Sequence, residues 1–568
     1  MPDAPPDAPP AAPASERAVL PAATHRSRRW PRDAIALGIV ALVFAIPLRG
    51  LLRAPGPPME EGFMLVFPER VLRGDIPNRD FLHLYGPGSL WALAGAFKVF
   101  GVSLLTERVF ALFQQLAIVA GVYLLARRWN RTLATGGAVV AALIIIPFGL
   151  TALAWVGAAG LGLLGLAAGL EARYRAEERV ACRFAVTSGL LLGVAVLFRL
   201  DLVVAVGLSM IALCRGLERR RRTRVLVGFG VGVAPYLILV ATAGLGNVVR
   251  GMVIDPVFNL RGGRGLPVPP SWSHYDGFLQ KAGSLQQLWW PIPNATGPQQ
   301  LFIWFFLLVA VVVFLLVQAW RLMRVDPTSV RARTLCVVAL YSAGILPQAL
   351  QRVDSAHFAW VGCVPFGFLP VALFEFGRRR LPRVRETRLV AGASAAALAL
   401  IVFVIPAYTI TRYTDYALQT FGAHRHSYRI EHDGRIFYYG KMDRAQAANL
   451  VIAEAARISR PGQKLFVGPV DLRKTPYSDA YLYYMLPDLK PGTYYIEMDP
   501  GVANSEDSGL DQDLAGSDIA ILDRIWANWE EPNDSRKTGS DKAAKVLAGR
   551  FCRVGTYLDL YDQYRRCR

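Results

Sequence analysis

Two adjacent carboxylates, Glu60 and Glu61, follow the first long apolar segment of the chain, and Asp80 lies further along the same loop. Acidic side chains held at a membrane boundary are costly and usually functional. A carboxylate in such a place can act as a general base that takes a proton from an attacking hydroxyl. The segment therefore predicts a chemical site. A solvated loop start is the other interpretation that the residues allow.

Two further charged clusters are predicted on the same side of the membrane as this loop. Arg199 and Asp201 lie in one turn between apolar segments, and Arg352, Asp354 and His357 lie in another. The planar guanidinium of arginine forms paired hydrogen bonds with a phosphate. Together with a carboxylate base, these residues indicate transfer of a group from a lipid phosphate. Alternatively, each arginine–aspartate pair only stabilises a helix end, and the histidine is a buried hydrogen-bonding residue.

These residues are set in a chain that is too apolar for a soluble globular protein of its length. The 568 residues are 53% hydrophobic, with a mean hydropathy of +0.31 and a net charge of +20. Runs of about 18 or more apolar residues mark membrane-spanning helices. We predict eleven such helices, at 33–52, 105–126, 133–150, 151–170, 184–198, 200–214, 225–243, 300–320, 334–350, 357–376 and 388–408.

Basic residues are concentrated in every second connection between these segments. The positive-inside rule places such connections in the cytoplasm. We therefore expect a multi-pass plasma-membrane protein with a cytoplasmic N-terminus and an extracytoplasmic C-terminal part. Residues 409–568 contain 22 basic and 22 acidic residues. The positive charge thus belongs to the cytoplasmic loops and their contact with the lipid bilayer, and it does not indicate nucleic-acid binding.

The sequence divides into three parts. Residues 1–32 are rich in proline and alanine and are predicted to be disordered. Residues 33–408 form the membrane domain, with a first outside loop at 53–104 and a long outside loop at 244–299, the latter expected to be ordered without helix. Within the first loop we expect two interfacial helices, at 61–73 and 88–100.

Residues 409–568 are predicted to form an extracytoplasmic α/β domain with a parallel sheet, because short strands alternate with helices. The expected helices are 443–459, 477–486, 508–515 and 541–549, and the expected strands are 464–469, 493–498 and 519–524. Cys552 and Cys567 both fall in this domain and are expected to form a disulfide. Two free thiols are the alternative.

The first outside loop resembles that of the C-type (GT-C) membrane glycosyltransferases. The likeness is to bacterial protein O-mannosyltransferase-like enzymes of glycosyltransferase family 39 and to the lipid A aminoarabinose transferase. It rests on an acidic pair after the first span, a Gly-Asp-x-Pro-x-Arg-Asp-Phe stretch, a Pro-Gly turn and a second helix ending in Phe-Lys-Val-Phe-Gly. These pieces are Glu60–Gly62, Gly74–Phe81, Gly86–Gly88 and Phe97–Gly101.

The resemblance implies an inverting enzyme that moves a monosaccharide from a polyprenyl-phosphate donor to an acceptor on the outer face. The acceptor would be a cell-envelope glycan, lipid or protein. By this match Glu60 or Glu61 is the general base, and Glu60 is favoured slightly. Many relatives have Asp-Glu at this pair, and many have Lys-Pro where this chain has Tyr85-Gly86-Pro87. A cationic phosphate contact is thereby lost beside Tyr85.

We expect Arg199 and Arg352 to hold the donor phosphate in its place. Asp201, Asp354 and His357 would orient these arginines or bind sugar, and Tyr85 would line the same site. Asp80 would be a second acid or a metal ligand, since some members of the family use a divalent metal. The sequence shows no certain cofactor. A flippase of a lipid-linked intermediate and a non-catalytic envelope-assembly scaffold remain as alternative functions.

Arg199→Ala or Arg352→Ala should weaken donor binding by about tenfold, because each removes a charge-assisted hydrogen bond to phosphate. Titration of a polyprenyl-phosphate sugar into the purified protein in nanodiscs measures this affinity. Arg324→Ala, in a predicted cytoplasmic loop, is the control and should bind as wild type. Unchanged affinity in both test variants would refute the assignment of a phosphate clamp.

Overall fold

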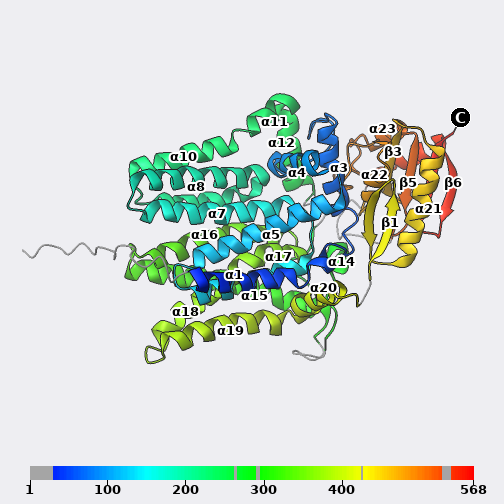
Figure 1. Ribbon diagram of the computed structural model, residues 1–568. Coiled ribbons are helices and arrows are strands. Elements are labelled where there is room, and N and C mark those ends of the chain that lie inside the picture. The colour runs from blue at the N-terminus through cyan, green and yellow to red at the C-terminus, as the bar shows by residue number, and fades with distance from the viewer. Residues whose placement is uncertain (1–29, 261–264, 289–294, 424–425, 528–538, 568) are drawn as a thin grey trace, which may run out of the picture.

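The computed structural model describes residues 30–260, 265–288, 295–423, 426–527 and 539–567. It contains a membrane domain of long helices packed side by side, with a smaller α/β domain at one end of the helices (Figure 1). The predicted N-terminal segment falls outside the described residues up to position 29. So do Arg261, Arg264, Trp289 and Trp290 of the long outside loop.

Ten helical segments of the described chain are long and apolar enough to cross a membrane. The predicted segment 200–214 forms a shorter apolar helix, so ten segments and this shorter one occupy the eleven predicted positions. Prolines interrupt some of these segments, so that one segment contains two helices. The helices are α1 (Trp30–Ala45), α5 (Leu104–Ala126), α6 (Arg131–Ile145), α7 (Ala154–Tyr174), α8 (Glu178–Phe198), α9 (Val203–Cys214), α10 (Arg219–Val233), α11 (Tyr236–Ala243), α15 (Gly297–Val325), α16 (Val330–Gln351), α17 (Ser355–Gly367), α18 (Leu369–Arg380) and α19 (Glu386–Val404).

Small residues allow the central helices to approach closely, as is common between membrane helices. A Cβ atom at Gly162 of α7 would lie 2.2 Å from the Tyr341 hydroxyl of α16. A Cβ atom at Gly344 of α16 would lie 2.3 Å from the Cα atom of Ala205 in α9. The helices α7 and α17 are almost wholly buried, whereas α1 and α19 lie at the edge of the domain.

The basic connections contact one another at the end of the helices away from the α/β domain. Arg333 donates to the carbonyl of Arg215 at 2.9 Å, and Arg173 donates to the same carbonyl at 3.1 Å. Arg128 forms an ion pair with Glu171 at 3.3 Å. The arginine-rich loops therefore form one continuous face, as the positive-inside rule requires of loops that share a compartment.

The first outside loop contains the two predicted helices, α3 (Glu60–Leu72) and α4 (Pro87–Phe100). The short helix α2 (Leu48–Leu51) precedes them. Most of α3 is buried on all sides, because it lies between the membrane helices and the α/β domain (Figure 1). Its amphipathic pattern had suggested a helix with one face in water. Its charged face is instead covered by the α/β domain, where Glu69 pairs with Arg435 at 2.9 Å.

The long outside loop is more helical than its glycine and proline content predicts. It begins with α12 (Leu245–Val249) and the π-helix η3 (Arg250–Asn259), and it contains the short α14 (Phe278–Ala282). The expectation of a loop without helix was therefore wrong for its first part. The glycine–proline run begins only after η3, so it ends the helix rather than preventing it.

The chain leaves the last span through η4 (Ala407–Thr411) and α20 (Arg412–Thr420) and then forms the α/β domain. A hairpin of β1 (Tyr428–His432) and β2 (Arg435–Tyr439) comes first, and a five-stranded sheet of order β4-β3-β5-β7-β6 follows. The strands of this sheet are β3 (Lys464–Pro469), β4 (Lys490–Pro491), β5 (Ile519–Asp523), β6 (Phe551–Tyr557) and β7 (Tyr561–Arg566). The helices are α21 (Met442–Ile458), α22 (Tyr481–Met485), α23 (Leu510–Ala515) and α25 (Lys542–Arg550).

Two predictions for this domain were wrong. The sheet is mixed, because β7 runs antiparallel to both β5 and β6. The hairpin of β6 and β7 was not predicted from the sequence. Segment 493–498 is not a strand, and its backbone bonds to the membrane domain instead. The Tyr494 carbonyl accepts from Leu82 N at 2.9 Å, and the Thr493 carbonyl accepts from Arg70 Nη1 at 3.2 Å. The segment that was predicted to be a strand thus forms a contact between domains.

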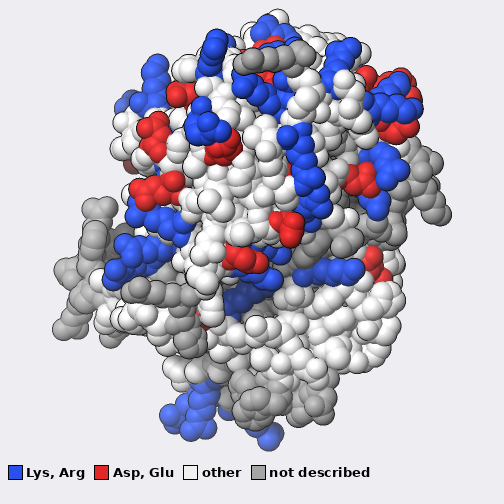
Figure 2. Space-filling view, turned by 90° about the vertical axis from the view of Figure 1, so that its right-hand side faces the viewer, with Lys and Arg blue, Asp and Glu red and all other residues white. Residues whose placement is uncertain are grey.

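A disulfide joins Cys552 of β6 to Cys567, which directly follows β7. Basic and acidic side chains are interspersed over the exposed face of the α/β domain, as Figure 2 shows. This distribution accords with the balanced charge of residues 409–568. The face shows no extended field of a single sign that would attract a polyanion.

Gly62→Ala should disrupt the contact between α3 and the α/β domain. A Cβ atom at this position would lie 2.3 Å from the Tyr481 backbone nitrogen, which cannot move without displacing α22. Overpacking of this kind costs about 1–3 kcal/mol. Thermal unfolding and limited proteolysis should both show a loosened α/β domain. Gly95→Ala in α4, where a Cβ atom meets nothing within 4 Å, is the control; equal behaviour of the two variants would contradict the packing.

Candidate active site

Glu60 begins α3 at the junction of the two domains, and its side chain is half-buried. The hydroxyl of Tyr477, from the α/β domain, donates a hydrogen bond to its carboxylate. The same hydroxyl accepts from Met59 N at 3.3 Å. Burial raises the pKa of Tyr477 well above its ordinary value, and the Glu60 charge adds to the rise. Tyr477 therefore stays protonated as a donor, and the positive end of the helix dipole favours a carboxylate at this position.

Glu61 points in another direction and is completely buried. Its two carboxylate oxygens accept from Arg108 Nε and Nη2 of α5, each at 2.8 Å. Arg108 also donates to the Leu51 carbonyl at 3.3 Å. The carboxylate packs against Gly56, where a Cβ atom would overlap it. Because consecutive helical residues are turned by about 100°, one residue of the acidic pair anchors α3 and the other faces the junction.

Tyr85 and Arg199 lie together beside this junction. The guanidinium of Arg199 stands over the Tyr85 ring, 4.6 Å from its centre. Gly86 and Gly88 make this approach feasible, because a Cβ atom at either would collide with Leu197 at the end of α8. The glycines of the Gly-Pro-Gly turn therefore allow the first outside loop to pack directly against the last turn of α8, which precedes Arg199.

Arg199 is held by further contacts. Its Nε atom donates to both carboxylate oxygens of Asp201 at 3.1 Å. The amide of Gln348, in the orientation that satisfies both neighbours, accepts from Arg199 Nη2 at 2.8 Å and donates to Asp201 at 2.6 Å. Asp201 and Gln348 line a cavity of about 310 Å³, whose apolar wall includes Trp155 and Val257. The arginine thus stands at a cavity that is polar at one end.

Two carboxylates of the α/β domain, Glu497 and Asp499, act on the same tyrosine. Burial raises the pKa of Tyr85 well above its ordinary value. The charges of Glu497, Asp499 and Glu60 raise this pKa further, whereas the Arg199 guanidinium lowers it. Tyr85 therefore lies within the electrostatic reach of three carboxylates and one arginine. It is a neutral group among charges contributed by both domains.

The cluster at the other turn has its own arrangement. Asp354 caps α17 by accepting from Ala356 N and His357 N, and its second oxygen lies 2.8 Å from His357 Nδ1. The His357 ring packs on Trp360, with centres 4.5 Å apart. Arg352, at the end of α16, has a buried Nη2 atom without a hydrogen-bond partner in the described part of the chain. This arginine retains a donor for a ligand.

Asp80 lies beyond the opposite end of α3 from Glu60. It pairs with Arg79 at 2.8 Å and accepts from Ile76 N at 2.7 Å, and the Arg79 hydrogen bond holds its pKa below the usual value. These contacts close a tight turn. The structure therefore does not bring Asp80 to the other predicted site residues, and we assign it no part in the chemistry.

The described residues contain no group of three or more histidine, cysteine or acidic side chains arranged to hold a metal ion. A Mg²⁺ ion is often bound by only one or two carboxylates together with substrate phosphates. The divalent metal that the family resemblance allows therefore stays a prediction, and we derive no step of a reaction through it.

Sequence reasoning missed Tyr477, Glu497, Asp499 and Gln348. Tyr477 is one of several tyrosines in the stretch that was predicted as the helix 477–486. Glu497 falls in the segment that was taken for a strand. Glu497 within this run and Asp499 directly after it were the available signal, because acidic residues are costly to bury without a function or a partner.

No protein-family model matches the chain, and no curated protein matches it by sequence. Solved structures are nevertheless similar. ArnT from Cupriavidus metallidurans, in structures with undecaprenyl phosphate and in the apo state, shares 14% identity at a TM-score of 0.52, covering 94% of this chain and 98% of ArnT. The oligosaccharyltransferase of Archaeoglobus fulgidus gives 12% identity and a TM-score of 0.46, covering 91% and 72%. The likeness to ArnT shows that this chain has a GT-C-like fold, as its first outside loop had suggested.

Glu61→Gln should destabilise the protein by about 3–5 kcal/mol, because it leaves the Arg108 charge buried without a counter-ion. The double variant Glu61→Met, Arg108→Met removes both charges and should recover much of this loss. Thermal unfolding in nanodiscs measures both effects. If Glu61→Gln unfolds as wild type does, the buried pair is not the anchor that its geometry indicates.

Proposed function

We propose that this protein is a membrane glycosyltransferase that moves a monosaccharide from a polyprenyl-phosphate donor to an acceptor on the outer face of the plasma membrane. The main support is the arrangement at the junction, where the Tyr477 hydroxyl of the α/β domain binds the Glu60 carboxylate and the Arg199 guanidinium stands over the Tyr85 ring. The fold adds to it, since a protein of the same fold has been seen with undecaprenyl phosphate. The distribution of arginines supports a cytoplasmic N-terminus and an extracytoplasmic α/β domain.

In this proposal Arg199 binds the donor phosphate. Its planar fork is the side chain best suited to a phosphate, and Tyr85 and Gln348 hold it at the cavity mouth. Asp201 keeps the guanidinium oriented while the site is empty of donor. Arg352 has a buried Nη2 atom without a partner in the described part of the chain. In this proposal its charge stabilises the phosphate, either in the bound donor or as the leaving group. The apolar wall of the cavity suits the first part of a polyprenyl chain.

Glu60 is the general base. It would take the proton of an acceptor hydroxyl while the hydroxyl oxygen forms a bond to the anomeric carbon of the sugar. The bond from that carbon to the phosphate oxygen breaks, and the phosphate leaves with the electron pair. A single displacement of this kind inverts the anomeric configuration. Tyr477 positions the carboxylate by its hydrogen bond, and Glu497 and Asp499, whose charges act on Tyr85, would bind hydroxyl groups of the sugar or the acceptor.

The α/β domain completes the site in this proposal, because it contributes the tyrosine that holds the base and two of the carboxylates. The acceptor would be a cell-envelope glycan, lipid or protein that enters between the domains. Asp354 and His357 would order the turn that carries Arg352, since the aspartate caps α17. No step requires a cofactor besides the donor lipid.

Glu60→Gln should lower sugar transfer by about a hundredfold or more, because general-base catalysis contributes about 10²–10⁴ in rate. Purified protein in nanodiscs would be assayed with a panel of polyprenyl-phosphate sugars and an envelope extract as acceptor. Glu431→Gln, which removes an exposed carboxylate of the α/β domain, is the control.

Wild-type transfer with loss in Glu60→Gln alone would support both the reaction and the base. Transfer that survives Glu60→Gln would refute the role of Glu60 as the general base, but it would still support the proposed transferase activity. Folded wild-type protein that transfers nothing with any donor would count against the proposed function.

A further inference from the structure

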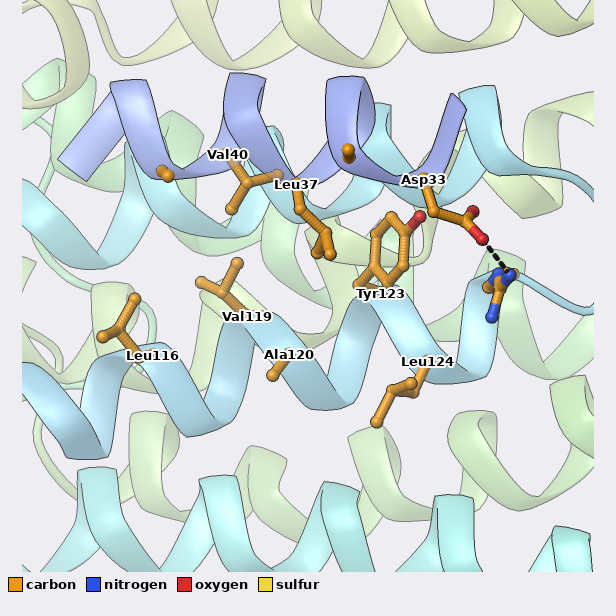
Figure 3. Close-up of a pocket in the computed structure, with 11 residues that line it drawn as sticks. Asp33, Leu37, Val40, Leu116, Val119, Ala120, Tyr123 and Leu124 are labelled. Carbon is orange, nitrogen blue, oxygen red and sulfur yellow. Dashed lines mark hydrogen bonds and ion pairs between the residues drawn. The ribbon is translucent and has the colours of Figure 1, made fainter. Parts of the chain in front are cut away.

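A groove with a mainly apolar lining lies between α1 and α5 on the side of the membrane domain away from the α/β domain. Its volume is about 740 Å³. Figure 3 shows Leu37 and Val40 of α1 facing Leu116 and Val119 of α5 across it. This part of the lining suits a hydrocarbon chain.

One end of this groove is basic. Asp33 there accepts hydrogen bonds from Arg127 and Arg131, which follow α5 and begin α6. A second cavity of about 880 Å³ shares Leu124 and Arg127 with the groove. Arg128, Arg131 and Arg175 line this second cavity together with Glu171. Four arginines thus face only two carboxylates, Asp33 and Glu171, and a surplus of positive charge remains where the apolar groove ends.

Two buried donors at this place lack acceptors in the described part of the chain. One is the Nε atom of Arg128, and the other is the hydroxyl of Tyr123, a residue that is only 6% exposed. In Figure 3 the Tyr123 ring stands beside Leu37 with its hydroxyl directed toward the Asp33 end of the groove. A buried donor without an acceptor costs about 1–3 kcal/mol. A ligand that supplies oxygen acceptors at this point would remove that cost.

We propose that the groove and the adjoining basic cavity bind an anionic phospholipid. One acyl chain lies between α1 and α5, and the phosphate lies among Arg127, Arg128 and Arg131, where it accepts from Arg128 Nε. The Tyr123 hydroxyl donates to an ester oxygen of the glycerol. Basic pockets between membrane helices on the cytoplasmic side commonly bind phosphorylated head groups. This site is independent of the proposed sugar transfer, since it lies at the opposite end of the helices from Glu60.

The test is native mass spectrometry of the detergent-purified full chain with added phosphatidylglycerol, phosphatidylcholine or glycerol 3-phosphate. Phosphatidylglycerol should bind about tenfold more tightly than phosphatidylcholine, because only its net charge complements the arginines. Ala120→Trp, which fills the groove, and Arg128→Gln, which removes the unpartnered donor, should each weaken this binding about tenfold. Two matched controls should bind as wild type. They are Val313→Trp at an exposed position of α15 and Arg379→Gln at the basic end of α18.

Equal binding of the two phospholipids would overturn the proposal, because it would show an ordinary lipid-facing surface. Binding of glycerol 3-phosphate as tight as that of phosphatidylglycerol, unaffected by Ala120→Trp, would also overturn it, since the groove would then contribute nothing. Thermal unfolding of each variant shows whether the variant is as stably folded as wild type. A variant that unfolds early is replaced by Leu37→Trp for the groove or by Arg128→Lys for the donor, with the same expected losses.

Discussion

The buried ion pair between Glu61 and Arg108 fixes the geometry on which the junction depends. Both carboxylate oxygens are taken by one guanidinium, and neither side chain has appreciable exposure. The same guanidinium binds the Leu51 carbonyl and stands 5.8 Å from the centre of the Tyr438 ring in β2. A single arginine of α5 thus contacts α2, α3 and the α/β domain. With α3 held in this way, the neighbouring carboxylate of Glu60 must face the space between the domains.

The second constraint is the docking of the α/β domain onto α3. The Pro58 carbonyl accepts from Tyr481 N at 3.2 Å, and Arg70 near the far end of α3 reaches the Thr493 carbonyl. Leu82 N completes the contact at the Tyr494 carbonyl. These bonds lead segment 493–499 past the first outside loop, and they account for the presence of Glu497 and Asp499 near Tyr85. The proposed site is therefore a composite of two domains, and neither domain holds it alone.

The sequence was a good guide to the features that follow from local composition. Apolar runs located the spans, and the acidic pair, the Gly-Pro-Gly turn and Arg199 directed attention to the junction. It was a poor guide where long-range contacts decide. The aromatic and aliphatic residues at 493–498 are equally compatible with a strand and with docking on another domain, and only the position of Arg70 and Leu82 selects the second. Likewise, no local pattern distinguishes Glu60 from Glu61, because the difference depends on an arginine 47 residues further along the chain.

The most direct test of the central claim is a cryo-EM structure of the full chain in nanodiscs with polyprenyl phosphate bound. The account predicts that the phosphate lies at Arg199, beside Tyr85, with the lipid chain leaving through the cavity lined by Trp155 and Gln348. The Glu60 carboxylate should face the side of the phosphate on which the sugar would stand. A phosphate bound away from Arg199, or a Glu60 side chain closed off from it by the α/β domain, would contradict the account.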